Sequence, residues 1–255
     1  MNLRYDIDPE EKARMVFTKM KAWIKNEKLM KYVKDQNLSQ IIPFLLYLVF
    51  YMIWFTILER LPRTRFFDLS SEIDTYIPLI VEFIIPYLSW FLFQAVWVVF
   101  VFFVDRKTYE QLTTMLMIGM TVFLIVSTFL PTKISLRPYY IESRGICAYL
   151  VRRLWAIDTP TNVWPSIHVF NTTALMMTLF TSEHPLLQKR TVRIPVVFWC
   201  GMIILSTMFL KQHSIGDVLS ALVLNGISYW VIYQAGVSLR FEEWDRRWAK
   251  SMTKL

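Results

Sequence analysis

Cysteine and histidine are scarce in this chain, and repeats are missing. The 255 residues include two cysteines and three histidines. Cys147 lies in a long polar segment and Cys200 inside an apolar run, so their depths are expected to differ by more than disulfide geometry allows. The sequence contains no internal repeat and no low-complexity segment either. These absences exclude a disulfide framework and a repeat architecture.

The N-terminal 39 residues lack the compact apolar core of a cleavable signal peptide. They hold nine of the 28 lysines and arginines, and apolar residues recur among them at helical spacing from Asp8-Pro9, which suit a helix start, to about Gln36. This pattern predicts an amphipathic helix on the membrane surface, with a solvated helix packed on a partner as the alternative. The expected partner is a bilayer with anionic lipids and not a nucleic acid, because no base-stacking surface accompanies the charge.

Long apolar runs dominate the rest of the chain. Apolar residues make up 55% of the sequence, in blocks that reach the roughly 20 residues a membrane helix requires. The run 76–104 is longer than one span needs, and Pro78, Glu82 and Pro86 lie in its first third, so we expect its span to begin near Pro86. The predicted fold is an all-α polytopic membrane protein, a six-helix bundle with spans at 41–58, 86–104, 111–130, 166–181, 194–210 and 217–237.

Basic residues divide unevenly between the two ends of these spans, 19 on one side and nine on the other. Because cytoplasmic segments carry the excess of lysine and arginine, both termini are expected in the cytoplasm. The expected organisation is a cytoplasmic or interfacial segment 1–39, a membrane catalytic domain 40–240 and a cytoplasmic amphipathic tail 241–255. The segments 131–165 and 211–216 then open together on the extracytoplasmic face of a cell membrane.

Two of the three histidines lie at the ends of predicted spans. His213 precedes Asp217 by one helical turn, so the carboxylate can hold one ring nitrogen protonated and leave the other as a nucleophile or base. The alternative is a pair that only caps a membrane helix. His168 follows Ser166, a suitable N-cap, in a first turn whose free amides form an anion site, and there it can protonate a leaving alkoxide. His184 falls in a loop on the opposite side.

The segment 131–138, after the third span, supplies positive charge on the same face. Arg137 offers a planar fork for two phosphate oxygens, and Lys133 a more mobile charge. A basic loop in contact with lipid head groups is the alternative. Two histidines and an aspartate also suit a metal, but the basic residues around them repel a cation, so no metal or other cofactor is expected.

These elements resemble the type-2 phosphatidic acid phosphatase superfamily over about 131–217. The family pattern is a Lys and Arg-Pro motif, then Pro-Ser-Gly-His, then Ser-Arg followed by His and Asp. The corresponding residues here are Arg137-Pro138, Pro165-Ser166-Ile167-His168, Ser206-Thr207, His213 and Asp217.

The resemblance implies a role for each matching residue. Arg137 binds phosphate with help from Ser166, His168 protonates the leaving group, and His213 attacks phosphorus to form a phosphohistidine. Asp217 orients His213. Six membrane helices and catalysis without metal are implied as well.

Three positions depart from the family pattern. The family's Lys position, seven residues before the Arg, is Leu130, Ile167 replaces glycine, and Thr207 replaces the third-motif Arg. One hypothesis is that Lys211, two residues before His213, supplies the missing charge. The combination of Pro-Thr and Arg-Pro, Pro-Ser-x-His and Lys-Gln-His resembles the branch that includes inositol phosphorylceramide synthases, which transfer a phospho head group between lipids.

The leading hypothesis is an integral membrane lipid phosphatase. It would cleave a lipid phosphomonoester or diphosphate through a phosphohistidine at the extracytoplasmic face, so a lipid phosphate is the expected substrate. One alternative keeps the first half-reaction and passes the head group to a lipid alcohol. Another, of a different class, is a non-catalytic membrane scaffold or lipid transporter. The sequence does not indicate a protein partner.

Overall fold

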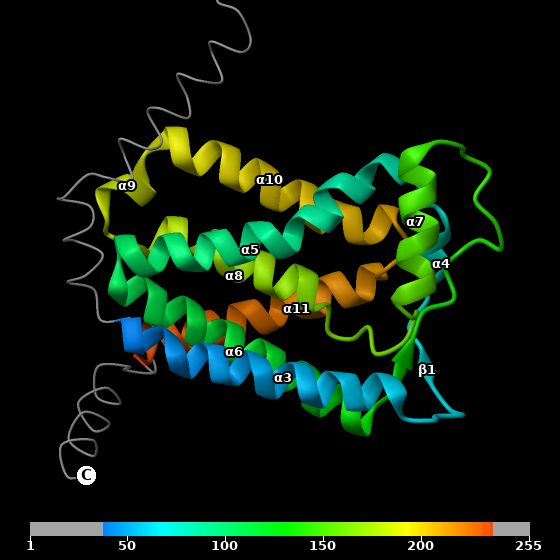
Figure 1. The fold of residues 1–255 in the computed structure, drawn as a ribbon, viewed down its shortest axis with the longest axis horizontal. Coiled ribbons are helices and arrows are strands. Elements are labelled where there is room, and N and C mark those ends of the chain that lie inside the picture. Colours follow the sequence, from blue (N-terminus) through cyan, green and yellow to red (C-terminus); the bar gives the residue numbers. More distant parts are fainter. Residues whose placement is uncertain (1–37, 237–255) are drawn as a thin grey trace, which may run out of the picture. The chain divides into compact units, whose positions relative to one another are not determined.

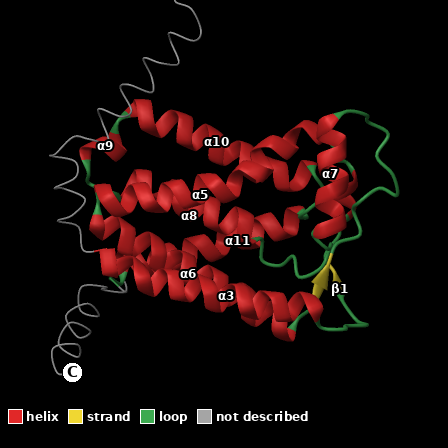
Figure 2. Ribbon diagram, viewed as in Figure 1, coloured by secondary structure: helices red, strands yellow, loops and turns green. Residues whose placement is uncertain are grey.

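A computed structural model describes residues 38–236 of the chain. The chain divides into two units, Met1–Gln40 and Ile41–Leu255. The amphipathic N-terminal helix and the tail 241–255 predicted from the sequence lie outside the described residues. A short 3-10 turn, η1 (Leu38–Ile41), comes directly before the first long helix. The described part of the second unit is largely helical, with two short strands, as the colouring in Figure 2 shows.

Within residues 38–236, five helices are long and apolar enough to cross a membrane. Helix α8 (Ile167–Thr181), predicted as the fourth span, has 15 residues. Its length of about 22 Å is less than the roughly 30 Å of a bilayer core. The all-α polytopic membrane fold is therefore confirmed, whereas the count of six spans is not. The five longer helices are α3 (Ile42–Arg60), α5 (Ile84–Val104), α6 (Arg106–Phe129), α10 (Arg190–Phe209) and α11 (Ile215–Tyr229), which continues as the π-helical turn η3 (Trp230–Gln234).

Helix α8 is the central helix of this unit. It packs against α5, α6, α10 and α11. Its contact with α6 is close, because a Cβ on Gly119 would lie 2.1 Å from the Phe170 ring, a distance that no side chain tolerates. Since protein covers α8 on these sides, its backbone is shielded from lipid despite its short length. In Figure 1 its start stops short of the neighbouring helix ends, so its first turn is recessed.

The end of the bundle where α8 starts carries most of the irregular structure (Figure 1). Helices α3, α6 and α10 run toward this end, and α5, α8 and α11 run away from it. The strands β1 (Phe67–Asp68) and β2 (Thr132–Lys133) pair in parallel here. The short helix α4 (Glu72–Thr75) and the 3-10 turn η2 (Val81–Phe83) lead into α5. We call it the α7 end, after the helix that crosses it.

Helix α7 (Ile146–Ile157) corrects the expectation of a long polar loop at 131–165. Its residues alternate between two faces, with Ala148 and Val151 fully buried and Arg152 and Arg153 exposed. Three-residue spacing of small apolar side chains is enough to hold an amphipathic helix on the bundle. The apolar stripe was too short to indicate a helix beside the long membrane runs.

The opposite end of the bundle holds the third histidine. His184 caps the short helix α9 (Pro185–Gln188), its Nδ1 accepting a hydrogen bond from the Leu186 amide at 3.3 Å. Figure 1 places α9 at the end far from α7. His184 is therefore remote from the other two histidines.

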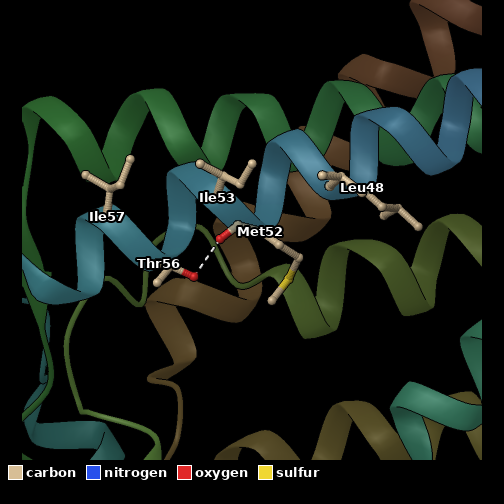
Figure 3. A pocket seen from close by; sticks show the side chains of 6 residues that line it. Leu48, Met52, Ile53, Thr56 and Ile57 are labelled. Carbon is tan, nitrogen blue, oxygen red and sulfur yellow. Dashed lines mark hydrogen bonds between the residues drawn. The ribbon is translucent and has the colours of Figure 1, made fainter.

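The outer face of α3 is apolar. A shallow groove along it is lined by Leu48, Val49, Met52, Ile53, Thr56 and Ile57 (Figure 3). Its one hydroxyl, on Thr56, donates to the Met52 carbonyl at 2.6 Å, so the groove offers no free polar group of its own. Such a surface suits contact with lipid chains and not catalysis.

Candidate active site

The two motif histidines lie next to each other at the α7 end. His168 belongs to the first turn of α8, and His213 to the turn between α10 and α11. Their ring centroids are 5.7 Å apart, and the ring planes are inclined at 57°. Two rings this close can both reach oxygen atoms of one phosphate group, because each hydrogen bond spans about 3 Å.

Aromatic side chains of α5 hold the ring of His168. The imidazole stacks on Tyr87 at a centroid distance of 4.8 Å and lies 4.3 Å from the ring of Trp90. Ser166 caps α8 as predicted, since its Oγ accepts a hydrogen bond from the Val169 amide at 3.3 Å. Stacking thus limits rotation of the ring, and the helix start fixes its position.

Backbone hydrogen bonds fold the segment before α11 into a tight turn around His213. The amides of Gln212 and His213 both donate to the Thr207 carbonyl, at 2.9 and 3.1 Å. Helix α11 then begins with a capping box, in which the Ser214 amide donates to Asp217 Oδ2 and the Asp217 amide donates to Ser214 Oγ. His213 is therefore fixed from both sides.

Asp217 faces the ring of His213 from one helical turn away. Its Oδ2 lies 3.4 Å from His213 Nδ1. This distance is slightly longer than that of an ordinary N–H···O hydrogen bond, about 2.7–3.2 Å. The carboxylate is fully buried. A buried negative charge at this distance favours a proton on Nδ1 and leaves the lone pair on Nε2.

Arg137 reaches the turn that carries His213. Its guanidinium donates to the Asp158 carbonyl at 2.8 Å and to Gln212 Oε1 at 2.6 Å, and it lies 5.7 Å from the centroid of the Trp155 ring. Burial lowers the pKa of Arg137, and the Asp158 carboxylate opposes that shift. Because arginine stays protonated in proteins, a full positive charge contacts Gln212, the residue directly before His213.

Asp158, directly after α7, joins the guanidinium to the aromatic residues around His168. Its Oδ2 accepts a hydrogen bond from the Tyr87 hydroxyl at 3.3 Å, while its carbonyl accepts from Arg137. Burial raises the pKa of the Asp158 carboxyl, and the charge of Arg137 works in the opposite direction. Asp158 thus links α5, α7 and the segment after β2 at the edge of the site.

The two lysines predicted to bind phosphate make other contacts. The Lys133 ammonium lies 3.8 Å from Asp68 Oδ2 and is partly exposed. Lys211 is buried, and its ammonium donates to the carbonyl oxygens of Asp74 and Ile77. Both charges are therefore engaged by the segment 67–77. Their contacts favour structural roles over the predicted phosphate binding.

Four buried nitrogen atoms of this cluster have no hydrogen-bond partner among residues 38–236. They are Arg137 Nε, His168 Nε2, Gln212 Nε2 and His213 Nδ1, of which the last faces Asp217 Oδ2 at 3.4 Å, so the first three are the atoms that can face a ligand. Leaving a buried polar atom unpaired costs about 1–3 kcal/mol, so several in one place indicate a ligand site. Arginine, amide and imidazolium N–H groups are donors, and their natural ligand is an anion with several oxygen atoms.

Sequence reasoning missed Gln212, Tyr87, Trp90 and Asp158. Tyr87 and Trp90 lie in an apolar run, where aromatic residues are typical of membrane interfaces. For Gln212, its position directly before His213 is the only feature of the sequence that could have indicated a place in the site. No group of three or more His, Cys, Asp or Glu side chains within the described part of the chain is placed to hold a metal ion.

Comparison with known proteins gives a family for the chain. The family model of the PAP2 superfamily matches residues 111–240, half of the sequence, and the match includes the segments that carry Arg137, His168 and His213. No curated protein and no solved structure matches the chain. Members of this superfamily are phosphatases and phosphotransferases. The chain belongs to the PAP2 superfamily.

Proposed function

We propose that the chain is an integral membrane lipid phosphatase that cleaves a lipid phosphomonoester or diphosphate. The observation that carries this proposal is the meeting of two imidazoles, with ring centroids 5.7 Å apart, and two buried nitrogen atoms, Arg137 Nε and Gln212 Nε2, that lack partners among the described residues. Such a cluster suits a tetrahedral anion that is attacked from one side and released on the other.

In the proposed first step, Nε2 of His213 attacks phosphorus. The new N–P bond forms as the bond from phosphorus to the lipid oxygen breaks, and protonated His168 gives its proton to that oxygen. Asp217, 3.4 Å from Nδ1, stabilises the positive charge that develops on the attacking ring. The Arg137 Nε and the Gln212 Nε2 donate to the non-bridging oxygens.

In the second step, water attacks the phosphohistidine. His168, now neutral, accepts a proton from the water as the new O–P bond forms and the N–P bond breaks. Inorganic phosphate leaves, and both histidines return to their starting states. Over the cycle, one ester and one water become one alcohol and one phosphate, so the proton carried by His168 is balanced.

The excess of lysine and arginine on the side of the two termini supports an extracytoplasmic site. The side that carries the site holds nine lysines and arginines, three of them in the motifs (Lys133, Arg137 and Lys211), against 19 on the side of the termini, and the smaller number is typical of the outer side. The termini would then be cytoplasmic. A recessed first turn of α8 would let the phosphate of a lipid enter while its chains stay in the bilayer.

The small number of cations favours a second candidate, transfer of a phospho head group to a lipid alcohol. Next to Arg137, the second proposed phosphate ligand is the neutral amide of Gln212. Thr207 and Leu130 occupy the positions of two family cations. A phosphomonoester carries about −1.5 to −2 charges at neutral pH, whereas a phosphodiester carries one. A single guanidinium matches the diester more closely.

Product analysis separates the two reactions. Purified protein in detergent micelles is given dioctanoyl phosphatidic acid or an isoprenyl diphosphate, and inorganic phosphate is measured. A second assay supplies ceramide or diacylglycerol with a phospholipid labelled in its head group. Phosphate release supports the phosphatase, and label that moves intact to the lipid alcohol supports the transferase. If neither product forms with any of these substrates, the proposed function is wrong.

A further inference from the structure

A strap of the chain, residues 71–80, is bound across the turn that carries His213. The strap comes between α3 and α5, and the turn, residues 209–215, between α10 and α11. At the far end of the strap, the Ile80 amide donates to the Phe209 carbonyl at 3.2 Å. Hydrogen bonds of Asp74 and Lys211 join the rest of the strap to the turn. The strap therefore meets the turn both before and after His213.

Asp74 is the centre of this connection. Its side chain is almost fully buried. Its Oδ2 accepts from the amide and the hydroxyl of Ser71, at 2.8 and 2.6 Å, which holds the strap in shape. Its Oδ1 accepts a hydrogen bond at 2.7 Å from the amide of Ile215, which is the first residue of α11. One carboxylate thus ties the strap to the helix that begins two residues after His213.

Lys211 makes the complementary connection from the other side. Its ammonium donates to the Asp74 carbonyl at 2.9 Å and to the Ile77 carbonyl. Its backbone has a φ of 54°, a left-handed conformation that is uncommon for a residue with a side chain and persists where surrounding contacts hold it. The ammonium supplies those contacts. Burial lowers the pKa of Lys211, and the Asp74 carboxylate opposes that shift.

We infer that Asp74 and Lys211 are positioning residues for His213, acting by clamping the strap onto its turn. This inference rests on the proposed function, in which His213 is the nucleophile. The clamp matters because only five residues lie between Phe209 and Ile215 to present the ring, and attack requires a defined distance and direction. Lys211 accordingly acts through the backbone of the strap and not on the phosphate.

The two roles available to Lys211 predict different kinetics. A phosphate ligand would raise KM when removed, because substrate binding would weaken. A positioning residue lowers kcat with little change in KM, because the substrate still binds but the attacking ring is misplaced. We expect Lys211→Met and Asp74→Ala each to lower kcat at least about ten-fold, with KM changed less than about two-fold. Dioctanoyl phosphatidic acid in micelles is the probe.

A matched control and a double variant complete the kinetic test. Glu72 is an exposed carboxylate in the same strap, and Glu72→Ala is expected to keep the wild-type kcat. Because Asp74 and Lys211 act through one clamp, the double variant should lose little more than the worse single variant. Losses that multiply, or a raised KM with unchanged kcat, would overturn the inference.

Hydrogen exchange gives a readout that needs no substrate. Asp74→Ala should speed exchange of the amides in 211–217 relative to wild type and to Glu72→Ala, while amides of α6 stay protected. Faster exchange everywhere would show general destabilisation and contradict a local clamp. If wild type is inactive toward all the probes, the proposed function fails; if wild type is active and Asp74→Ala matches it in both measurements, only the clamp is refuted.

Discussion

The two histidines of the site are held by different kinds of contact. His168 is part of a helix that four other helices surround, and its ring stacks on Tyr87 and lies against Trp90. His213 lies in a turn, where the hydrogen bonds of Thr207, Asp217 and the strap define its place. One ring is positioned by apolar packing and the other by polar contacts.

This difference suits the two proposed tasks. A ring that only gives and takes a proton needs to stay near the leaving oxygen, and stacking allows that with small adjustments. A ring that forms a bond to phosphorus needs a defined direction, which hydrogen bonds supply. Substitutions around the two histidines are therefore expected to differ in size and in kind.

The largest effect is expected at the attacking ring. His213→Ala removes the covalent route, so kcat should fall about 100-fold or more. His184→Ala is the matched control, because it removes the same side chain at the opposite end of the bundle. Steady-state assays of both variants against wild type provide the measurement. Wild-type turnover by His213→Ala would favour a scaffold or lipid transporter instead.

The next effect concerns the guanidinium beside the His213 turn. Arg137→Lys keeps the positive charge but loses the planar fork that reaches Gln212 and, in the proposed mechanism, the phosphate. Loss of a charged hydrogen bond of about 1.5–3 kcal/mol predicts roughly a 10- to 100-fold fall in kcat/KM. Arg153→Lys, on the exposed face of α7, serves as the control. Equal activity of Arg137→Lys and wild type would remove Arg137 from the phosphate site.

The pH dependence tests the division of tasks between the rings. Attack needs a neutral His213 and proton donation needs a protonated His168, so kcat/KM should follow a bell-shaped curve. Each limb should fall about ten-fold per pH unit once one of the two forms is depleted. Initial rates between pH 4 and 10 give the profile. A flat curve with chemistry rate-limiting would contradict opposite protonation states.

The smallest effect is expected from the aromatic contact of His168. Tyr87→Phe keeps the stacked ring and removes only the hydroxyl bound to Asp158, whereas Tyr87→Leu removes the stacking as well. Stacked aromatic pairs contribute about 0.5–1.5 kcal/mol, so Tyr87→Leu should lower kcat by roughly two- to twelve-fold and Tyr87→Phe by less. If the phenylalanine variant proves the weaker enzyme, the hydroxyl and not the stacking holds His168.

The long apolar runs allowed the fold to be predicted, because bilayer helices satisfy their own backbone and need only length and hydrophobicity. The start of α5 at Ile84 lies two residues from the prediction at Pro86. Helix α7 was missed because its buried stripe is short. The apolar run of α8 predicts a membrane span, although its 15 residues depend on neighbouring protein.

The candidate site was only partly predictable. Spacing of four residues placed Asp217 beside His213, since both belong to one local turn. Spacing did not show where Lys211 points, because its partners, Asp74 and Ile77, lie more than 130 residues away in the sequence. Long-range contacts of this kind follow from the packing of α10 against the start of α5, which no local pattern records.

Trapping the covalent intermediate tests attack by His213 most directly. Wild type, His213→Ala and His184→Ala are incubated briefly with phosphate-labelled dioctanoyl phosphatidic acid and quenched in base. We expect acid-labile, base-stable label on wild type and His184→Ala, and none on His213→Ala. Equal labelling of the His213→Ala protein would contradict attack by His213.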